Sequence, residues 1–377
     1  MSDGEEAVRQ SGLSTMRTST NFLNEAAWRY FWHPVCTVAE LRAAAAEGKR
    51  PLAVTLLGER LALAEIGGCV AALDDRCIHR STKLSVGRVE AGGLRCAYHG
   101  WLYGADGRCR EIPSMPDHSI PDDCKVGAHD ATIEYDLVWV RLDSSLDTRI
   151  PGCPAFGDAA FRCVAGEPYT WPTSAARRLE NFVDLAHFPF VHDGSLGDRR
   201  QTRVPIAKVD RLNRELRFQF VPSPEMQLPG VALMAPTDYR LWVPFTVNLE
   251  FFFPDGERSQ LWMSASPVES GVCRSFWFTS RTADRDGPDQ PHLDFQALVL
   301  SEDLPVIEAQ EPPEIPAPSE EYSVRTDKVS VAYRRWLKEL SKAAETSADA
   351  LARCLDSVRI ESDRTFDDMP PSASAAE

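Results

Sequence analysis

The stretch that begins at Cys77 and ends at Trp101, CIHRSTKLSVGRVEAGGLRCAYHGW, pairs a cysteine with a histidine twice. One residue separates Cys77 from His79, and two residues separate Cys96 from His99. The two pairs are 16 residues apart, so we expect two short loops that each offer one thiolate and one imidazole. Donors of this kind bind metal, and one domain should be built around them.

Two occupants fit these loops. The first is a tetrahedral zinc ion, although zinc sites commonly use pairs of cysteines. The second is a Rieske [2Fe-2S] cluster, in which two cysteines hold one iron and two histidines hold the other. Mixed loops favour the cluster, because each loop can then contribute to both irons. The spacing resembles the Rieske family, and because neither loop carries an additional cysteine, it resembles the oxygenase type.

The composition indicates an acidic globular protein with two domains. The chain has 377 residues, and 43% of them are hydrophobic. A single hydrophobic core rarely serves more than about 250–300 residues, so a chain of this length should form two domains. The net charge of −15 argues against a nucleic-acid partner, which would need clustered Lys and Arg. The polar opening MSDGEEAVRQ and the lack of a long apolar run predict a cytoplasmic protein without a membrane span. Ten scattered cysteines fit a reducing compartment.

Periodicity divides the chain into four segments. We expect a flexible extension (1–26), an all-β Rieske domain (27–148), a catalytic domain (149–364) and a disordered tail (365–377). The catalytic segment mixes strand and helix patterns, so we predict an α+β fold of helix-grip type, with helices on one face of an antiparallel sheet. The expected helices are 175–191, 291–300 and 326–344, and the expected strands are 215–221, 242–253, 259–266 and 273–281.

A second group of polar residues lies in the segment ENFVDLAHFPFVH. Asn181, Asp184 and His187 are spaced three apart and would lie near one face of a helix. His192 follows His187 by five residues, which places it roughly 140° further round a regular helix than His187. Both imidazoles can therefore meet one metal only if the helix ends or distorts between them, and Pro189 would do this.

Two histidines and one carboxylate form the facial triad of non-haem iron(II) oxygenases. The segment SEDLPVIEAQ offers Glu302, Asp303 and Glu308 as the carboxylate. Similar text in Rieske monooxygenases implies that Asp303 is the iron ligand, with Glu302 as the nearest competitor. The alternative is that His187 and His192 are ordinary helix residues.

The chain more closely resembles bacterial methylxanthine (caffeine-type) N-demethylases. One departure is Leu179, where we expect tryptophan, and the text after His192 also differs. The stretches that carry the resemblance are 29–41, 75–88, 138–144, 177–184, 301–310, 327–336 and 360–363.

The resemblance implies a terminal oxygenase that removes an N-methyl group as formaldehyde, with a [2Fe-2S] cluster and one mononuclear Fe(II). It also implies that Asp184 links His187 to His99 of a neighbouring chain, within a homotrimer or a hetero-oligomer with a homologous subunit. Asn181 would lie just behind the iron ligands. The chain lacks a G-x-G-x-x-G fingerprint, so a separate reductase must oxidise NAD(P)H.

Helical spacing also suggests residues that face the substrate. Gln296 and Leu300 lie seven and three residues before Asp303, so all three share one stripe of a helix. Gln296 could bond to purine carbonyls and ring nitrogens, and Leu300 could pack on the ring. Both could instead simply pack or face solvent.

Two other functions remain open. The first is O-demethylation or hydroxylation of another small aromatic substrate. If that substrate were an anion, we would expect an arginine on the helix stripe that carries Gln296, Leu300 and Asp303. The second is a Rieske electron carrier or ligand-binding module without an active mononuclear iron.

Overall fold

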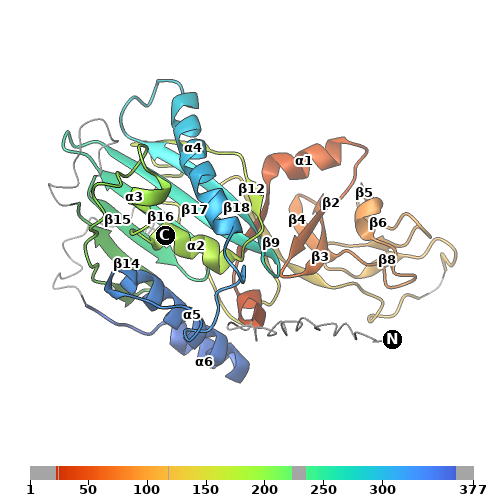
Figure 1. The fold of residues 1–377 in the computed structure, drawn as a ribbon. Coiled ribbons are helices and arrows are strands. Elements are labelled where there is room, and N and C mark those ends of the chain that lie inside the picture. The colour runs from red at the N-terminus through yellow and green to blue at the C-terminus, as the bar shows by residue number, and fades with distance from the viewer. Residues whose placement is uncertain (1–22, 24, 118, 223–234, 362–377) are drawn as a thin grey trace, which may run out of the picture.

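The computed structural model describes residues 23, 25–117, 119–222 and 235–361, which form two domains side by side (Figure 1). The expected tail (365–377) and residues 1–22 and 24 of the expected extension lie outside this range. None of the helices in the described ranges combines the length and apolar composition that a membrane-crossing segment requires.

The first domain consists of two antiparallel sheets. The larger sheet has the order β1-β10-β9-β4-β3-β2, and the smaller one has the order β5-β6-β7-β8. The strands are β1 (His33–Thr37), β2 (Leu52–Leu56), β3 (Glu59–Ile66), β4 (Cys69–Asp74), β5 (Arg88–Glu90), β6 (Gly93–Arg95), β7 (Leu102–Tyr103), β8 (Cys109–Glu111), β9 (Ala128–Glu134) and β10 (Leu137–Arg141). The first Cys/His loop follows β4, and the second joins β6 to β7.

The expectation of an all-β first domain was wrong in one element. Helix α1 (Val38–Ala46) connects β1 to β2. Its N-terminus is a capping box, in which Thr37 accepts from the Glu40 backbone and the Glu40 side chain accepts from the Thr37 backbone. The alanines that follow are strong helix formers. Both signals were present in the sequence.

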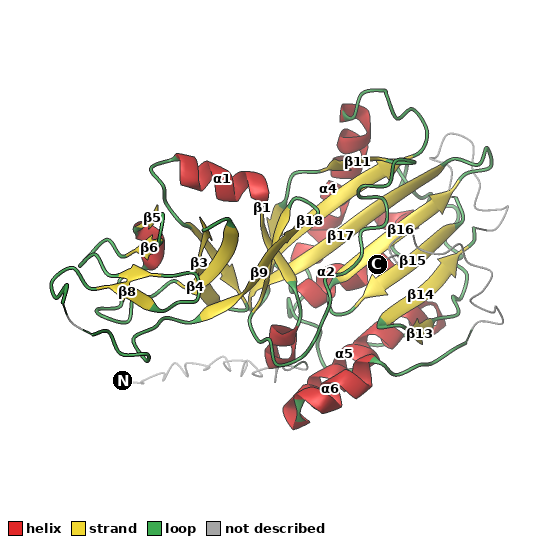
Figure 2. Cartoon of the chain, turned by 180° about the vertical axis from the view of Figure 1, so that it is seen from behind, coloured by secondary structure: helices red, strands yellow, loops and turns green. Residues whose placement is uncertain are grey.

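The second domain is an eight-stranded antiparallel sheet with helices on one face. The path is β11-β18-β17-β16-β15-β14-β13, and β12 also pairs with β18. The strands are β11 (Arg162–Ala165), β12 (Tyr169–Trp171), β13 (Asp210–Leu212), β14 (Glu215–Phe220), β15 (Thr237–Trp242), β16 (Thr246–Phe252), β17 (Arg258–Glu269) and β18 (Val272–Arg281). The helices are α2 (Ala175–Val183), α3 (Phe188–Val191), α4 (Gln290–Glu308), α5 (Lys328–Thr346) and α6 (Ala348–Leu355). Seen from behind, the sheet lies in front of α2 and α4 (Figure 2).

Buried side chains of both layers form the main core, including Leu179 of α2, Val247 of β16 and Trp336 of α5. The strands expected from the sequence are present, although β16 begins four residues later than predicted. Strands β11, β12, β13 and β15 were not predicted. The predicted 291–300 helix is too short, because α4 continues through Pro305 to Glu308.

The expected flexible extension ends earlier than residue 26. Leu23 is buried, and a 3-10 helix, η1 (Glu25–Tyr30), follows. Trp28 of this helix lies in the core of the second domain and makes an edge contact with Phe245 at 5.3 Å between ring centroids. This packing explains why the segment is ordered. The boundaries at 148 and 364 stay predictions.

Candidate functional site

The segment from α2 to α3 places the polar residues of the second group. Ser174 caps α2 by accepting from the Arg177 backbone. The helix then ends at Val183, so the expected helix over 175–191 was wrong. Asp184 is its C-terminal cap, and His187 lies beyond it, just before α3. Pro189 does not end a helix as predicted, because it lies in the first turn of α3, where a missing backbone N–H costs little.

This irregular turn brings His187 and His192 together with Asp303 of α4. The two Nε2 atoms are 3.2 Å apart, and Asp303 Oδ1 lies 3.5 Å from that of His187 and 3.4 Å from that of His192. Neighbouring ligands of one ion are roughly 3 to 3.5 Å apart when each bond is about 2.1 Å long. The three atoms therefore fit one face of a metal ion, and His192 and Asp303 are only 2% and 4% exposed.

Two side chains of α2 hold the Asp303 carboxylate. Asn181 Nδ2 donates to Oδ1 at 3.1 Å, and Arg178 Nη1 approaches Oδ2 at 3.4 Å. Burial would raise the pKa of Asp303, but hydrogen bonds from the two histidines and the charge of Arg178 hold it well below its usual range. Asp303 is thus kept anionic, the form that binds metal.

Arg178 is a functional residue that the sequence reasoning missed. It is fully buried, donates to the Tyr169 hydroxyl at 2.8 and 3.0 Å, and lies over the Trp171 ring at 4.3 Å. It also donates to the Asn181 side chain. The sequence places Arg178 one helical turn before Asn181 but does not reveal the partners that bury it.

Glu302, the competing carboxylate, lies behind His192 rather than in the triad. His192 Nδ1 is 2.8 Å from Glu302 Oε2, and Ser195 Oγ donates to the same oxygen at 2.7 Å. A carboxylate on the far nitrogen fixes the tautomer and leaves Nε2 free for a metal. Burial lowers the pKa of His192, but Asp303 and Glu302 together raise it above its usual value. Glu308 is exposed near the end of α4.

Asp184 lies on the other side of His187. Its Oδ1 accepts from the Ala186 backbone at 2.8 Å, and its Oδ2 is 3.9 Å from His187 Nδ1. The His187 Nδ1 atom is buried without a hydrogen-bond partner among the described residues. The Asp184 side chain is 40% exposed, so one side of this carboxylate faces outward.

The Cys/His loops of the first domain converge at its far end. The His79 and His99 rings lie 4.5 Å apart, and His79 stacks on Trp101 at 4.5 Å. Cys77 and Cys96 are buried, and burial, then the neighbouring Cys77 thiol, raise the pKa of Cys96. The Nδ1 atom of His79 is buried and has no partner in the described part of the chain, as expected for a metal-binding atom.

The spread of these four donors argues against a single zinc ion. The ligands of one tetrahedral zinc are about 3.3 to 3.8 Å apart. Among the described residues, sets of three or more potential ligand atoms within 4.8 Å of one another occur at the triad and at Glu59, Asp74 and His129. The two cysteines and two histidines do not form such a set, which fits a larger two-iron cluster.

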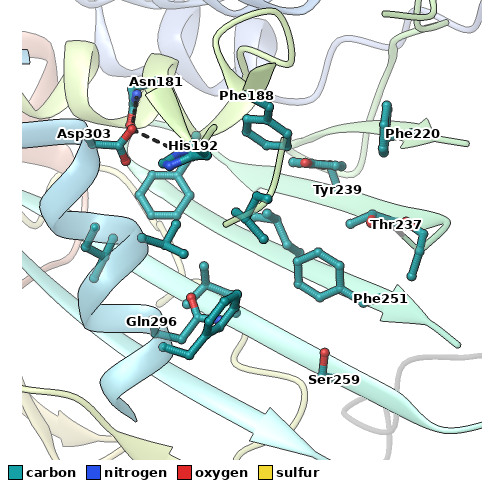
Figure 3. Close-up of a pocket in the computed structure, with 18 of the residues that line it drawn as sticks. Asn181, Phe188, His192, Phe220, Thr237, Tyr239, Phe251, Ser259, Gln296 and Asp303 are labelled. Atoms are coloured by element: carbon teal, nitrogen blue, oxygen red, sulfur yellow. Dashed lines mark hydrogen bonds and ion pairs between the residues drawn. The ribbon is translucent and has the colours of Figure 1, made fainter. Parts of the chain in front are cut away.

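A pocket of about 210 Å³ opens beside the triad, between the helices and the sheet (Figure 3). Gln296 and Leu300 of α4 line it together with Asp303. The other walls are mostly aromatic or aliphatic. They comprise Phe182, Phe188, Leu196, Phe220, Ala235, Leu249, Phe251, Phe253, Leu261, Phe295 and Val299, with the polar residues Asn181, Thr237, Tyr239 and Ser259.

Two family models match the chain. The Rieske [2Fe-2S] domain matches residues 31–126, and the vanillate O-demethylase oxygenase C-terminal domain matches residues 171–343. The chain belongs to the Rieske non-haem iron oxygenase family. Methylxanthine N3-demethylase NdmB of Pseudomonas putida is 46% identical to this Rieske oxygenase over 329 residues, 85% of this chain and 92% of that protein. Methylxanthine N1-demethylase NdmA of the same organism is 42% identical over 340 residues, 90% and 96% of the two chains.

The structure of Pseudomonas putida CBB5 NdmA with caffeine superposes with a TM-score of 0.85, at 41% identity, over 91% of this chain and 99% of that one. NdmB of the same strain gives a TM-score of 0.83 at 43% identity. The predicted order of a Rieske domain followed by an α+β oxygenase domain is therefore confirmed. This Rieske oxygenase uses a [2Fe-2S] cluster and a mononuclear iron, so the electron-carrier and ligand-binding alternatives are wrong.

Proposed function

We propose that this chain is the terminal oxygenase of a Rieske monooxygenase that N-demethylates a methylxanthine, releasing formaldehyde. The observation that carries the proposal is a two-histidine, one-carboxylate triad at the wall of a small aromatic pocket. The relatives that act on methylxanthines match nearly the whole length of the chain.

The proposed ligands of the mononuclear iron are His187, His192 and Asp303. Their mutual distances, their burial and the hydrogen bonds behind two of them support this assignment. When bound, the iron activates dioxygen for attack on a methyl C–H bond. The hydroxymethyl group then left on the ring nitrogen collapses to an N–H group and formaldehyde.

The proposed ligands of the cluster are Cys77 and Cys96 on one iron and His79 and His99 on the other. The two buried thiols lie beside each other, and so do the two imidazoles, which supports this pairing. The Tyr103 hydroxyl lies 3.1 Å from Cys77 Sγ, close enough to hydrogen-bond to the thiolate. Hydrogen bonds to the sulfurs are one of the features that set the potential of such a cluster.

The remaining step is electron transfer between chains. We propose that Asp184 connects His187 of one chain to His99 of the next, in a homotrimer or in a hetero-oligomer with a homologous subunit. The outward side of Asp184 and the exposure of His99 leave room for such a contact. Electrons would reach the cluster from a separate NAD(P)H-dependent reductase. We also propose a cytoplasmic location, which the ten unpaired cysteines support.

O-demethylation or hydroxylation of another small aromatic substrate is the alternative. An anionic aromatic substrate of that kind would favour a cation in the site. None of the described residues that line the pocket is an arginine or a lysine, which supports an uncharged substrate such as a methylxanthine.

The direct test is to incubate the protein with a compatible reductase, NADH and a panel of methylxanthines, and to measure formaldehyde. We expect one molecule of formaldehyde for each methyl group removed. No formaldehyde from any methylxanthine, together with turnover of an O-methyl aromatic compound, would overturn the proposed substrate and leave the reaction class intact.

A further inference from the structure

The sheet side of the pocket carries a polar group that the reaction scheme above does not use. Strand β15 directs Thr237 and Tyr239, two residues apart, toward the pocket, because alternate side chains of a strand share one face. Tyr239 is only 2% exposed, and its ring stacks on Phe218 at 4.3 Å between centroids, with 17° between the planes. This stacking fixes the ring and therefore the direction of its hydroxyl.

The Tyr239 hydroxyl has no hydrogen-bond partner in the described part of the chain. The other two fully buried tyrosines there both have one. Tyr333 donates to the Pro244 carbonyl at 2.8 Å, and the Tyr103 hydroxyl lies against Cys77. Polar groups in a folded protein usually make a hydrogen bond, so a hydroxyl that lines the pocket without a partner in the protein is available to a ligand or water there.

The hydroxyl points into the pocket, toward the side where His192 lies (Figure 3). Thr237, its neighbour on the same strand, already donates its hydroxyl hydrogen to the Ala235 carbonyl at 2.8 Å, so it is not available as a donor to a ligand. Burial raises the pKa of Tyr239 well above its ordinary value, so the group keeps its proton and remains a donor at neutral pH.

We propose that the Tyr239 hydroxyl donates a hydrogen bond to a carbonyl oxygen of the methylxanthine and, together with Gln296 on α4, sets which methyl group faces the triad. This inference rests on the proposed function. The carbonyl groups of a xanthine adjoin two of the ring nitrogens that can carry methyl groups, N1 and N3. A donor on the sheet and an amide on the helix can therefore fix both the position and the rotation of the planar ring.

The test compares two ligands with two proteins. Binding of caffeine and of an N-methylpurine without carbonyl groups is measured by calorimetry, for the wild type and for Tyr239→Phe, which removes only the hydroxyl. We expect the variant to bind caffeine about tenfold more weakly, the loss of one hydrogen bond, and to bind the carbonyl-free ligand as the wild type does. In turnover, the ratio of the demethylated products should also shift.

The matched control is Tyr322→Phe, the same change at a residue that is 93% exposed and does not line the pocket, and it should change neither dissociation constant. Thermal unfolding shows whether Tyr239→Phe is folded. Unchanged caffeine binding in Tyr239→Phe, or equal weakening for both ligands, would overturn the role of the hydroxyl alone. A wild type that binds no methylxanthine would overturn the proposed function and this inference with it.

Discussion

The cluster loops and the triad use similar side chains, yet they differ in sequence separation and in burial. The four cluster residues lie within one short stretch, and His99 and its neighbour Tyr98 are exposed at the end of the domain. His192 and Asp303 are 111 positions apart in number and almost completely buried. A centre that exchanges electrons with partners benefits from exposure, whereas a centre that activates dioxygen must exclude water.

The supporting contacts differ in the same way. In the cluster loops the backbone makes the tight turn, where the Gly100 N–H donates to the Cys96 carbonyl and Gly100 takes a φ of +72°. At the triad, buried or half-buried side chains from α2 and α4 hold the carboxylate and one imidazole. The loops are therefore a local structure, and the triad depends on how the second domain packs.

The largest expected effect is the loss of one metal centre while the other stays intact. Asp303→Ala should remove the mononuclear iron and reduce demethylation to background, while the visible spectrum of the cluster stays unchanged. Total iron should fall from about three to about two per chain. Metal analysis and formaldehyde assays check this, with Glu308→Ala, an exposed carboxylate on the same helix, as the control that keeps both. Full iron content in Asp303→Ala would contradict the assignment.

A second variant breaks the connection between the centres and leaves each intact. Asp184→Asn should keep about three irons per chain and a normal cluster spectrum but lose at least roughly a hundredfold in turnover, because the proposed path between chains is interrupted. Asp193→Asn, an exposed acid close by in sequence, is the control. Rapid reoxidation of the reduced cluster by substrate and oxygen in Asp184→Asn would refute the bridge.

Two adjacent arginines on α2 allow a sharper test of the buried network. Arg178 contacts Asp303, whereas Arg177 is equally buried but donates to Glu321 at 2.8 Å, away from the triad. Arg178→Met should weaken iron(II) binding at the triad by roughly 10- to 100-fold, as changes behind metal ligands usually do. It should leave the cluster spectrum unchanged.

Arg177→Met should lower the melting temperature without a specific loss of iron affinity, since its contacts hold only the connector before α5. Iron(II) titration of both variants, followed by measurement of their melting temperatures with and without metal, distinguishes a specific loss of iron affinity from a general loss of stability. If both variants lost iron to the same degree, Arg178 would be a fold-stabilising residue only.

The same contrast explains how much the sequence could predict. The cluster loops follow from residue types at fixed local spacing, so Cys77, His79, Cys96 and His99 could be proposed directly. The triad needed a family resemblance to select Asp303, because spacing alone left Glu302 open. The structure separates these two residues, since successive positions on α4 point to opposite sides of His192.

Features that depend on tertiary packing could not be predicted. The end of α2 at Val183 is one example, because no glycine or proline lies there and the chain turns to bring His187 back toward α4. The role of Arg178 is another, since a buried arginine looks like a surface residue until its partners are known. The role of Tyr239 could not be predicted either, because the strand that carries it, β15, was not expected.

The smallest expected effect is a pH dependence of stability at the junction between the cluster domain and the triad domain. His33 of β1 is 2% exposed, its Nε2 lies 2.9 Å from the Trp28 carbonyl, and its ring is 5.9 Å from Phe245 of the second domain. Burial lowers the pKa of His33 to about 4, although the hydrogen bond to Trp28 opposes this. The folded protein therefore keeps this imidazole neutral at pH values where the unfolded chain protonates it.

Between pH 6.5 and about 4 the unfolded state binds more protons at this site, so stability should fall as the pH is lowered through this range, by up to about 3 kcal/mol. The melting temperature should drop from pH 7.5 to pH 5.5 more in the wild type than in His33→Gln, which cannot take up the proton. Other titrating groups are common to both proteins and cancel in this comparison. Because His33 contacts both domains, the extra loss should appear equally in the unfolding of the cluster domain and of the triad domain. Identical pH dependence in the two proteins would show that His33 does not couple the regions.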